Sequence, residues 1–258
     1  MALGLVRIIL VEPAGPMNVG SVARVMKNFG FNHLVLVNPQ CDPLSAEARQ
    51  MAVHAKDVLE SALSVETLPE ALQGCTRAIA TTARVRYWDS PLENPRTALP
   101  WLLENSEQST ALIFGREDRG LSNEELNYAQ RFIRIPTSSS YPSLNLATAV
   151  ALCCYELAQI EVEAEKHGDT QTENIPQPLQ DPAPMDFLEA YYQELESLLL
   201  KIGYLYPHTS ASRMAKFRQL YNRSQIQNKE VSMLRGILRQ VEWALGQDGR
   251  SQNLDEEL

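Results

Sequence analysis

Short apolar runs alternate with helix-like patterns over the first two thirds of the chain, and this alternation constrains the fold more than any other feature. The runs span residues 8–11, 34–37, 78–81, 112–114 and 132–135. They are short and rich in β-branched and aromatic residues, which predicts the strands of a parallel sheet covered on both faces. Helical patterns lie between them, at residues 19–29, 46–59, 68–73, 98–104, 123–129 and 146–165. Residues 1–166 are therefore expected to form an α/β domain with a layered architecture.

The chain changes character after residue 166. Residues 167–185 carry four prolines among polar and acidic residues, with little apolar surface to bury, which predicts an extended linker. Amphipathic patterns then return at residues 187–199, 211–221 and 229–245. These three helices predict a small all-helical domain over residues 186–246. Residues 247–258 are expected to form a flexible tail.

The composition excludes several classes of protein. With 44% hydrophobic and 21% charged residues, the 258-residue chain has the make-up of an ordinary globular protein. No apolar stretch is long enough to span a bilayer, and residues 1–7 lack the pattern of a secretory signal, so a cytoplasmic location is predicted. The four cysteines show no metal-ligand spacing and the four histidines are scattered. We expect buried thiols and no metal.

Charge is distributed unevenly along the sequence. The formal net charge is −9, yet residues 209–239 contain seven basic residues and one acidic residue, whereas residues 161–186 are acidic. A basic segment on an acidic protein is typical of a surface that binds a phosphate backbone, and Phe217 and Tyr221 lie within it for packing or for stacking on bases. The alternative is a well-solvated helical surface.

Three segments combine features that loops around a ligand need. Residues 18–30 form an amphipathic helical pattern that carries Arg24 and Lys27 on one face. Residues 111–121 form an apolar strand that enters a loop with glycines at 115 and 120, where the backbone can approach closely. In residues 135–147 a strand breaks at a proline, passes through small polar residues and enters a long helix, which Ser143 or Asn145 could cap.

Together and in this order, the three segments resemble the signature motifs of the SpoU branch of the SPOUT RNA methyltransferases. The matching residues are Asn18, Gly20 and Arg24, then Phe114, Gly115, Glu117, Gly120 and Leu121, and finally Ile135, Pro136, Ser143, Leu144 and Asn145. The closer resemblance covers nearly the whole chain and is to the bacterial tRNA 2′-O-ribose methyltransferases that modify cytidine or uridine 32 in the anticodon loop.

This resemblance carries implications for fold and assembly. Spacing alone favours an unknotted doubly wound sheet, because knots are rare. The SPOUT resemblance instead implies a parallel sheet whose C-terminal segment forms a deep trefoil knot, with the cofactor bound at the knotted loops. It also implies a homodimer in which each active site draws residues from both subunits.

The resemblance assigns a role to individual residues. It implies a catalytic group of Arg24, Ser143, Arg84 and Arg86. Ser143 would help to position the 2′-hydroxyl, and Arg84 and Arg86 would act on RNA phosphates or on the target nucleotide. Because an arginine is not readily deprotonated, we favour stabilisation of the developing 2′-oxyanion over proton abstraction for Arg24. S-adenosylmethionine is the implied cofactor, held by Thr81, Thr82, Ala83, Gly115, Ile135, Pro142, Ser143 and Leu144. Asn18, Glu117 and Asn145 are expected to brace the loops. RNA contacts are predicted for Lys27, Arg116, Arg213, Lys216, Arg218 and Arg223.

Other functions stay open from the sequence. Within the same family, the chain could be a SpoU-type 2′-O-methyltransferase that acts on ribosomal RNA or on another tRNA position. A dinucleotide-dependent oxidoreductase would need Gly-x-Gly-x-x-Gly after the first strand, where residues 12–17 read Glu-Pro-Ala-Gly-Pro-Met. An RNA-binding module without catalysis would tolerate the loss of Arg24 and of the cofactor loop, yet both are present. The expected partners are tRNA and a second copy of the chain, and neither DNA nor a membrane.

Overall fold

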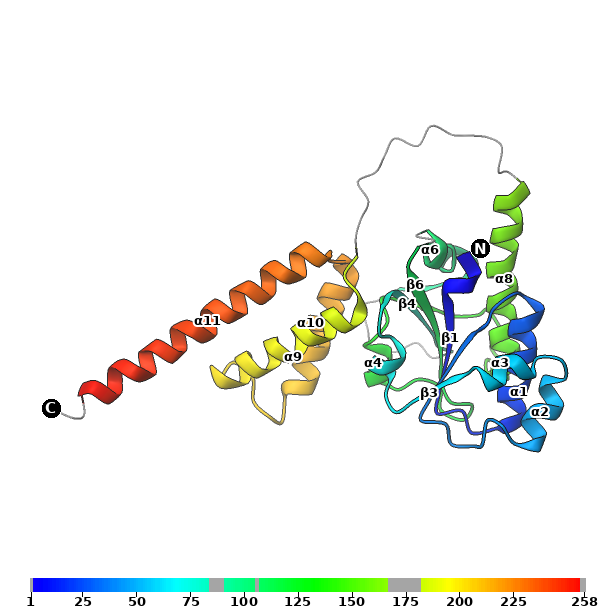
Figure 1. Cartoon of the computed structure of the whole chain (residues 1–258), viewed down its shortest axis with the longest axis horizontal. Coiled ribbons are helices and arrows are strands. Elements are labelled where there is room, and N and C mark those ends of the chain that lie inside the picture. The colour runs from blue at the N-terminus through cyan, green and yellow to red at the C-terminus, as the bar shows by residue number, and fades with distance from the viewer. Residues whose placement is uncertain (1, 84–90, 105–106, 167–181, 256–258) are drawn as a thin grey trace. The chain divides into compact units, whose positions relative to one another are not determined.

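The computed structural model describes residues 2–83, 91–104, 107–166 and 182–255. The chain divides into two compact units, Met1–Gln177 and Pro178–Leu258. The first unit contains the sheet and the second unit is helical, as Figure 1 shows. None of the described helices is both long enough and apolar enough to cross a membrane.

A seven-stranded sheet forms the centre of the first unit, and every strand pair in it is parallel. The strand order is β3-β2-β1-β6-β4-β7-β5. The strands are β1 (Val6–Val11), β2 (His33–Val37), β3 (Leu63–Val65), β4 (Cys75–Thr81), β5 (Leu92–Glu93), β6 (Ser109–Phe114) and β7 (Arg131–Ile133). The predicted parallel sheet is confirmed, with two additional edge strands, β3 and β5. These two produce no apolar run in the sequence, because β3 is mostly exposed and β5 has only two residues.

The helices of the first unit follow the predicted positions with two exceptions. They are α1 (Pro16–Asn28), α2 (Ala46–Ala52), α3 (Lys56–Glu60), α4 (Leu68–Ala71), α5 (Pro95–Ala98), α6 (Pro100–Leu103), α7 (Asn123–Leu126) and α8 (Leu146–Lys166), after a 3-10 turn η1 (Ala2–Leu5). The helix predicted at residues 46–59 is broken at Val53, whose φ is +54°. The helix predicted at residues 98–104 is two short helices, because Pro100 lacks an N–H and begins the second one.

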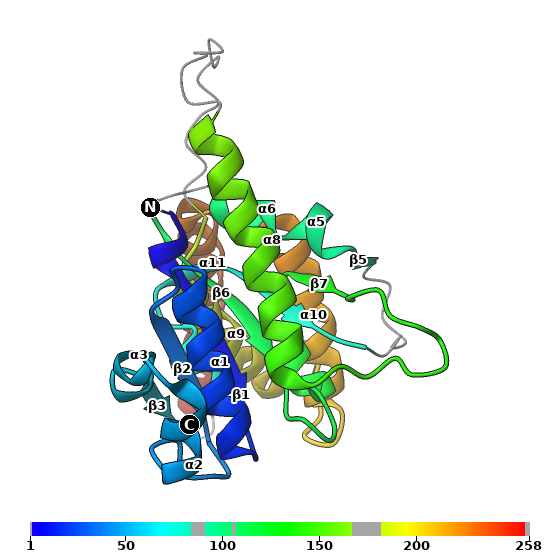
Figure 2. The same ribbon diagram turned by 90° about the vertical axis from the view of Figure 1, so that its right-hand side faces the viewer.

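Helices cover both faces of the sheet. Helices α1 and α8 lie side by side on one face, together with α2 and α3, whereas α4 lies on the other face (Figures 1 and 2). The core beneath α1 and α8 contains Val19, Val22 and Met26 from α1, and Val150, Cys153 and Leu157 from α8. Their spacing of three and four residues is the reason why each segment forms a helix against the sheet.

The strand order brings three loops together. Strands β6, β4 and β7 are adjacent and parallel, so the loops that follow them emerge at the same edge of the sheet. These three loops contain the second and third motif segments and residues 81–83. Ligands of open parallel sheets bind beyond the carboxyl ends of the strands. The topology therefore collects the predicted cofactor residues at one place.

The second unit consists of α9 (Met185–Lys201), α10 (Ser210–Ser224) and α11 (Asn228–Asp255). Its core is built from Leu188, Tyr191, Tyr192, Leu195, Leu198, Leu205, Met214, Val231 and Leu238, with Ala183. Because Ala183 is buried and α9 begins at Met185, the helical unit starts before residue 186 and the predicted linker is too long at its end. Helix α11 continues to Asp255, beyond the end predicted for the third helix at residue 245.

Candidate active site

A pocket of about 370 Å³ lies where the loops after β4, β6 and β7 meet. It is lined by all eight residues predicted to hold the cofactor: Thr81, Thr82, Ala83, Gly115, Ile135, Pro142, Ser143 and Leu144. Its apolar wall comes from Phe114, Leu121, Ile133, Leu146 and Ala149, and its charged residues are Arg116, Glu117, Asp118 and Arg119. A pocket of this size, with apolar walls and few charges, suits a ligand of nucleoside size.

The loop after β6 closes tightly on itself at Gly115. The N–H of Gly120 donates to the carbonyl of Arg116 over 2.8 Å. A Cβ atom at position 115 would lie 2.3 Å from the carbonyl carbon of Gly120 and 2.3 Å from the nitrogen of Leu121. Backbone atoms cannot yield to such a contact, so only glycine fits at position 115. The close approach explains the glycine spacing seen in the sequence.

Hydrogen bonds tie the other loops to the sheet. The N–H of Thr82 donates to the carbonyl of Ile133 at 3.0 Å, and the hydroxyl of Thr81 donates to the carbonyl of Ile113 at 3.1 Å. Within the third motif, the hydroxyl of Thr137 donates to the carbonyl of Pro142 at 3.1 Å. The loop that carries Ser143 is thus held by a bond that needs no N–H from Pro142.

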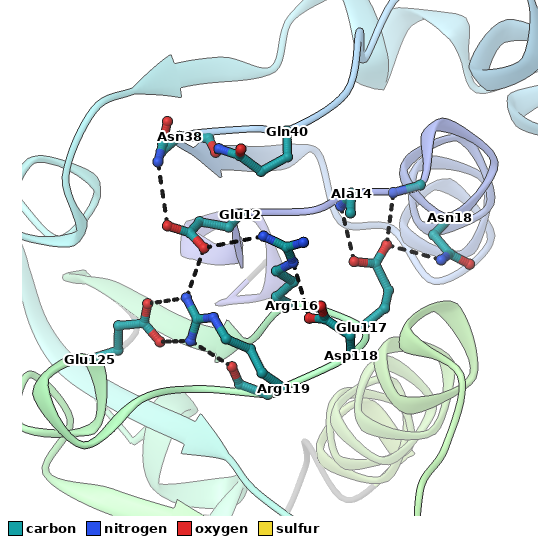
Figure 3. A network of polar contacts seen from close by, with 12 residues as sticks. Glu12, Ala14, Asn18, Asn38, Gln40, Arg116, Glu117, Asp118, Arg119 and Glu125 are labelled. Atoms are coloured by element: carbon teal, nitrogen blue, oxygen red, sulfur yellow. Dashed lines mark hydrogen bonds and ion pairs between the residues drawn. The ribbon is translucent and has the colours of Figure 1, made fainter.

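Glu117 joins the second motif to the first (Figure 3). One carboxylate oxygen accepts from the N–H of Ala14 at 3.0 Å, and the other accepts from the N–H of Gly15 at 3.1 Å and from the side-chain amide of Asn18 at 3.0 Å. Burial raises the pKa of this carboxyl group, but the hydrogen bonds, that from Ala14 foremost, lower the pKa by more. The result is a pKa below the ordinary value, so Glu117 remains ionised as an acceptor.

Asn145 extends this chain of hydrogen bonds to the third motif. Its amide nitrogen donates to the side-chain oxygen of Asn18 at 2.9 Å. Its own oxygen accepts from the N–H of Ala147 at 2.9 Å, which caps α8. Of the two candidates for this cap, Asn145 is the one that makes the bond. The order Glu117, Asn18, Asn145 therefore links all three motif segments around the pocket.

A second network lies beside the first and was not found in the sequence. The Arg119 guanidinium bridges Glu12, at 2.8 Å, and Glu125, at 2.8 Å (Figure 3). The hydrogen bonds that Arg119 donates to both carboxylates, that to Glu125 first, raise the pKa of Arg119 further above its ordinary value. Glu12 also accepts from the side chain of Asn38 at 3.3 Å. Because Glu125 belongs to the capping box of α7, the network fixes the loop after β6 to both β1 and α7.

Arg24 does not line the pocket of its own chain. It lies on the exposed face of α1 and makes no hydrogen bond or ion pair with the residues that the structure describes. Lys27, three residues further along α1, forms an ion pair with Asp57 at 2.7 Å. Arg84 and Arg86 lie outside the described residues.

The predicted RNA-binding cations differ in their surroundings. Arg116 lines the pocket and pairs with Asp118 at 3.0 Å. In the helical unit, Arg213, Lys216 and Arg223 are exposed, as a phosphate contact requires. Arg218 instead forms an ion pair with Glu189 and lies over the ring of Tyr192, 4.5 Å from its centre.

The aromatic residues of the basic segment, for which packing and stacking were both left open, pack against the core of the helical unit. Tyr221 contacts Tyr191 edge to face, with 5.3 Å between ring centres, and accepts a hydrogen bond from its hydroxyl at 2.9 Å. Phe217 packs against the same core. Arg218 and Tyr221 thus hold α10 on α9, which fits the packing role left open for Tyr221. The RNA contact predicted for Arg218 stays a prediction.

The cysteines and acidic residues form no metal centre in the described part of the chain. Cys75, Cys153 and Cys154 are buried, and Cys41 is half-buried, so the expectation of buried thiols is wrong for Cys41. Burial raises the pKa of the Cys153 thiol to about 12. No group of three or more His, Cys, Asp or Glu side chains among the described residues is arranged to hold a metal ion.

Comparison with known proteins agrees with this geometry in both units. Residues 186–253 match the C-terminal domain of the tRNA methyltransferase TrmJ. The tRNA (cytidine/uridine-2′-O-)-methyltransferase TrmJ of Pectobacterium atrosepticum is 38% identical over 92% of this chain and 96% of its own length. The tRNA (cytidine/uridine/adenosine-2′-O-)-methyltransferase TrmJ of Pseudomonas aeruginosa is 39% identical over 93% of this chain and 95% of its own length.

The solved structures extend the likeness to three dimensions. The crystal structure of TrmJ from Z. mobilis ZM4 superposes with a TM-score of 0.80 at 32% identity, and the match covers 92% of this chain and 98% of that one. The family model of the SpoU rRNA methylases matches residues 5–155, which include the whole pocket and all three motif segments. The chain belongs to the SpoU rRNA methylase family.

Proposed function

We propose that the chain transfers a methyl group from S-adenosylmethionine to the ribose 2′-hydroxyl of tRNA, at cytidine or uridine 32 of the anticodon loop. The observation that carries the proposal is the pocket at the carboxyl ends of β4, β6 and β7, braced by Glu117, Asn18 and Asn145. Support for the tRNA substrate comes from the two relatives, which are named as tRNA 2′-O-methyltransferases and match this chain over nearly their whole length. Such a substrate places the enzyme in the cytoplasm.

The pocket fits S-adenosylmethionine in size and chemistry. A volume of about 370 Å³ with apolar walls accommodates an adenosine group, and the backbone of residues 81–83, 115 and 142–144 supplies the polar edge. We assign cofactor contacts to these residues and to Ile135. When bound, the cofactor supplies the methyl group on a positively charged sulfur. The Glu117 carboxylate would not form an ion pair with this sulfur, because its oxygens already accept hydrogen bonds from Ala14, Gly15 and Asn18.

Arg24 is assigned to the developing 2′-oxyanion of the ribose. The side chain is exposed and unpaired among the described residues, so its guanidinium is available to an incoming RNA. A guanidinium remains protonated at any working pH, and it offers five donors in a rigid fork. It can therefore orient phosphate and ribose and stabilise negative charge as the bond forms. Ser143, exposed at the pocket, would position the hydroxyl.

A homodimer accounts for the separation of Arg24 from the pocket. Helix α8 exposes Leu152, Tyr155 and Val162 at 41%, 44% and 40%, on one face of the helix. The neighbouring helix α1 exposes Met17 at 58%, and Arg24, seven residues later, shares its face. We propose that a second copy covers this apolar face and that each Arg24 acts at the partner's pocket. From the family resemblance, we also propose that the C-terminal segment of the sheet domain forms a deep trefoil knot.

A mixing experiment tests the shared site. Arg24→Ala keeps an intact pocket, whereas Ala83→Trp fills the pocket and keeps Arg24. If Arg24 acts across the dimer, mixing the two inactive variants restores part of the activity, because one pocket of each mixed dimer is complete. No recovery after confirmed subunit exchange, or a fully active monomer in sedimentation at working concentration, would contradict the proposal.

A second candidate concerns the target nucleotide. The relative from Pseudomonas aeruginosa is named for adenosine as well as cytidine and uridine, at nearly the same identity as the others. The alternatives are therefore a wider range of bases at the same position, another tRNA position, or ribosomal RNA. The match of residues 186–253 to a tRNA methyltransferase domain favours tRNA.

Mapping of ribose methylation separates these candidates. Total tRNA and ribosomal RNA are compared in cells with and without this protein, and the purified protein is then given unmodified tRNA with S-adenosylmethionine. We expect loss of methylation at position 32 alone and its restoration in vitro. An unchanged tRNA pattern together with a lost ribosomal methyl group would replace the proposed substrate.

A further inference from the structure

The turn between α9 and α10 exposes aromatic rings, whereas Tyr191 and Tyr192 in the core of the helical unit are buried. Tyr204 and Tyr206 are 53% and 54% exposed, and the intervening Leu205 is buried at 2%. His208 stacks on Tyr206, with 6.0 Å between ring centres and 26° between planes. We call Tyr204, Tyr206 and His208 the aromatic turn.

Backbone hydrogen bonds hold the aromatic turn in place. Gly203, with φ +74°, ends α9, and the N–H groups of Tyr204 and Leu205 both donate to the carbonyl of Leu199 at 3.0 Å. The carbonyl of Tyr206 accepts from the N–H of Thr209 at 2.9 Å, at the beginning of α10. With Leu205 anchored in the core between them, the two tyrosine rings are directed outward from a fixed backbone. Rings that are ordered in advance lose little entropy when a ligand stacks on them.

The aromatic turn lies in a stretch of sequence that has basic residues and no acidic ones. No Asp or Glu occurs between Ser197 and Lys229, in a chain whose net charge is −9. Lys201 and Lys216 are exposed, and the Arg213 guanidinium lies over the Tyr204 ring, 5.8 Å from its centre. Arg213 also donates to the carbonyl of Tyr204 at 3.3 Å, which keeps the cation beside the ring.

We propose that the aromatic turn is a stacking site for unpaired bases of the RNA substrate, with Arg213 and Lys216 holding the adjacent phosphates. Exposed rings next to exposed cations are the arrangement with which proteins bind single-stranded nucleic acid. Bases in a duplex are already stacked on each other, so the site would select the loop or end of a tRNA over its stems. The inference rests on the proposed function, because it takes tRNA as the substrate and adds where and how its unpaired bases bind.

Binding measurements on the full-length protein test this site. The probes are an unmodified tRNA transcript, a single-stranded oligouridine and an RNA duplex of equal length. We expect Tyr204→Ala with Tyr206→Ala to weaken binding of tRNA and oligouridine about tenfold or more. Tyr204→Phe with Tyr206→Phe should bind like the wild type, because the rings are retained. Duplex binding should change little.

The salt dependence separates stacking from charge. Arg213→Ala or Lys216→Ala should each lower the slope of log affinity against log salt by about one phosphate's share, roughly 0.7–0.9. The two tyrosine substitutions should leave that slope unchanged. Trp243→Ala is the matched control, because Trp243 is an exposed ring, at 61%, on α11 of the same unit. It should leave RNA affinity unchanged.

Three results would overturn the proposal. The first is wild-type affinity for oligouridine in the double alanine variant with an unchanged melting curve. The second is a loss of affinity in the double alanine variant that is equal for the duplex and the single strand, or a loss of RNA affinity in Trp243→Ala as large as in that variant. The third is unchanged RNA binding with a loss of self-association in sedimentation, which would make the turn a protein interface. Methyl transfer by the wild type is measured in parallel, so failure of the aromatic turn is distinguished from failure of the proposed function.

Discussion

The two units handle charge in opposite ways. Around the pocket, Glu117 is held by Ala14, Gly15 and Asn18, and Arg119 lies between Glu12 and Glu125. In the helical unit, five of the seven basic residues between positions 209 and 239 are exposed: Arg213, Lys216, Arg223, Lys229 and Arg239. The charges around the pocket fix loops, whereas most basic residues of this segment of the helical unit are exposed.

The difference predicts two kinds of recognition. A pocket that binds through shape and main-chain groups should hold its cofactor with little dependence on salt. A surface that binds through exposed cations releases counterions from the nucleic acid, so its affinity falls steeply as salt rises. Arg24 differs from the other charges of the first unit discussed above, since it is exposed and has no partner in the part of the chain that the structure describes. The substitutions below test where each residue belongs.

Arg24→Ala should have the largest effect. We expect methyl transfer to fall on the order of a hundredfold to a thousandfold, because a preorganised donor to the developing oxyanion is lost. Cofactor binding should persist, since Arg24 does not line the pocket of its own chain. Single-turnover transfer to tRNA at saturating cofactor measures the rate, and calorimetry measures the binding. A near wild-type rate would remove Arg24 from the mechanism.

Arg24→Lys distinguishes two ways in which the residue could act. Lysine keeps the positive charge and loses the planar fork of donors. Partial activity would indicate simple electrostatic stabilisation, and a rate as low as that of Arg24→Ala would indicate positioning through paired hydrogen bonds. Arg24 would in both cases differ from Arg119, whose guanidinium is paired with two carboxylates of its own chain.

Removal of the helical unit should have the next largest effect. Without residues 178–258, tRNA affinity should fall by about tenfold or more and the salt slope should flatten, because several phosphate contacts are lost. Cofactor affinity should stay within about twofold, because the pocket lies entirely within Met1–Gln177, which forms a compact unit of its own. An equal salt slope with and without the unit would assign the helices another purpose.

Periodicity predicted the sheet well, because each long strand contains a buried apolar run. It missed β3, which is mostly exposed, and β5, which has only two residues. It also joined α2 and α3 into one helix, because Val53 has a positive φ, which a valine does not lead one to expect from the sequence. Sequence periodicity thus predicts the helices and strands that pack in the core, and it fails where the backbone conformation of a single residue ends a helix.

The sequence motifs predicted which residues would line the pocket, but they did not predict the hydrogen bonds and ion pairs between these segments. Asn18, Glu117 and Asn145 were all expected to brace the loops. Only the fold shows that Asn18 is the common partner of the other two, which lie 99 and 127 residues away along the chain. Arg119 and Glu12 are 107 residues apart and carry no sequence signal of their pairing. In the helical unit, the sequence could not separate Arg218, paired with Glu189, from Arg213, which is exposed.

Glu117→Ala tests the braced side of the comparison. The substitution leaves the N–H groups of Ala14 and Gly15 without their acceptor, so we expect a loss of about 2 kcal/mol in the free energy of unfolding. Cofactor affinity should also fall, because the loop after β6 is no longer held to the N-terminal end of α1. Denaturant unfolding and calorimetry measure the two effects. Unchanged stability and unchanged affinity would show that the network is not needed.

Glu117→Gln isolates the contribution of the charge through its pH dependence. Because the hydrogen bonds hold the pKa of Glu117 below its ordinary value of 4.5, the ionised form is favoured in the folded state. The resulting stability is present above pH 4.5 and is lost as the pH falls through the folded-state pKa. The wild type should therefore exceed Glu117→Gln in stability at pH 7, and the difference should shrink in acid. A constant difference would exclude the charge as its cause.

Lys27→Ala should have the smallest effect, although Lys27 and Arg213 are both exposed cations that the sequence assigns to RNA. Lys27 is paired with Asp57 at 2.7 Å, and its charge is largely compensated before any RNA arrives. We expect tRNA affinity to change by less than about threefold, with a smaller fall in salt slope than in Arg213→Ala. Asp57→Ala is the matched control: if Lys27 faces the RNA, removing its partner should raise tRNA affinity at low salt. An equal fall in slope for Lys27→Ala and Arg213→Ala would show that pairing within the chain does not decide which cations bind RNA.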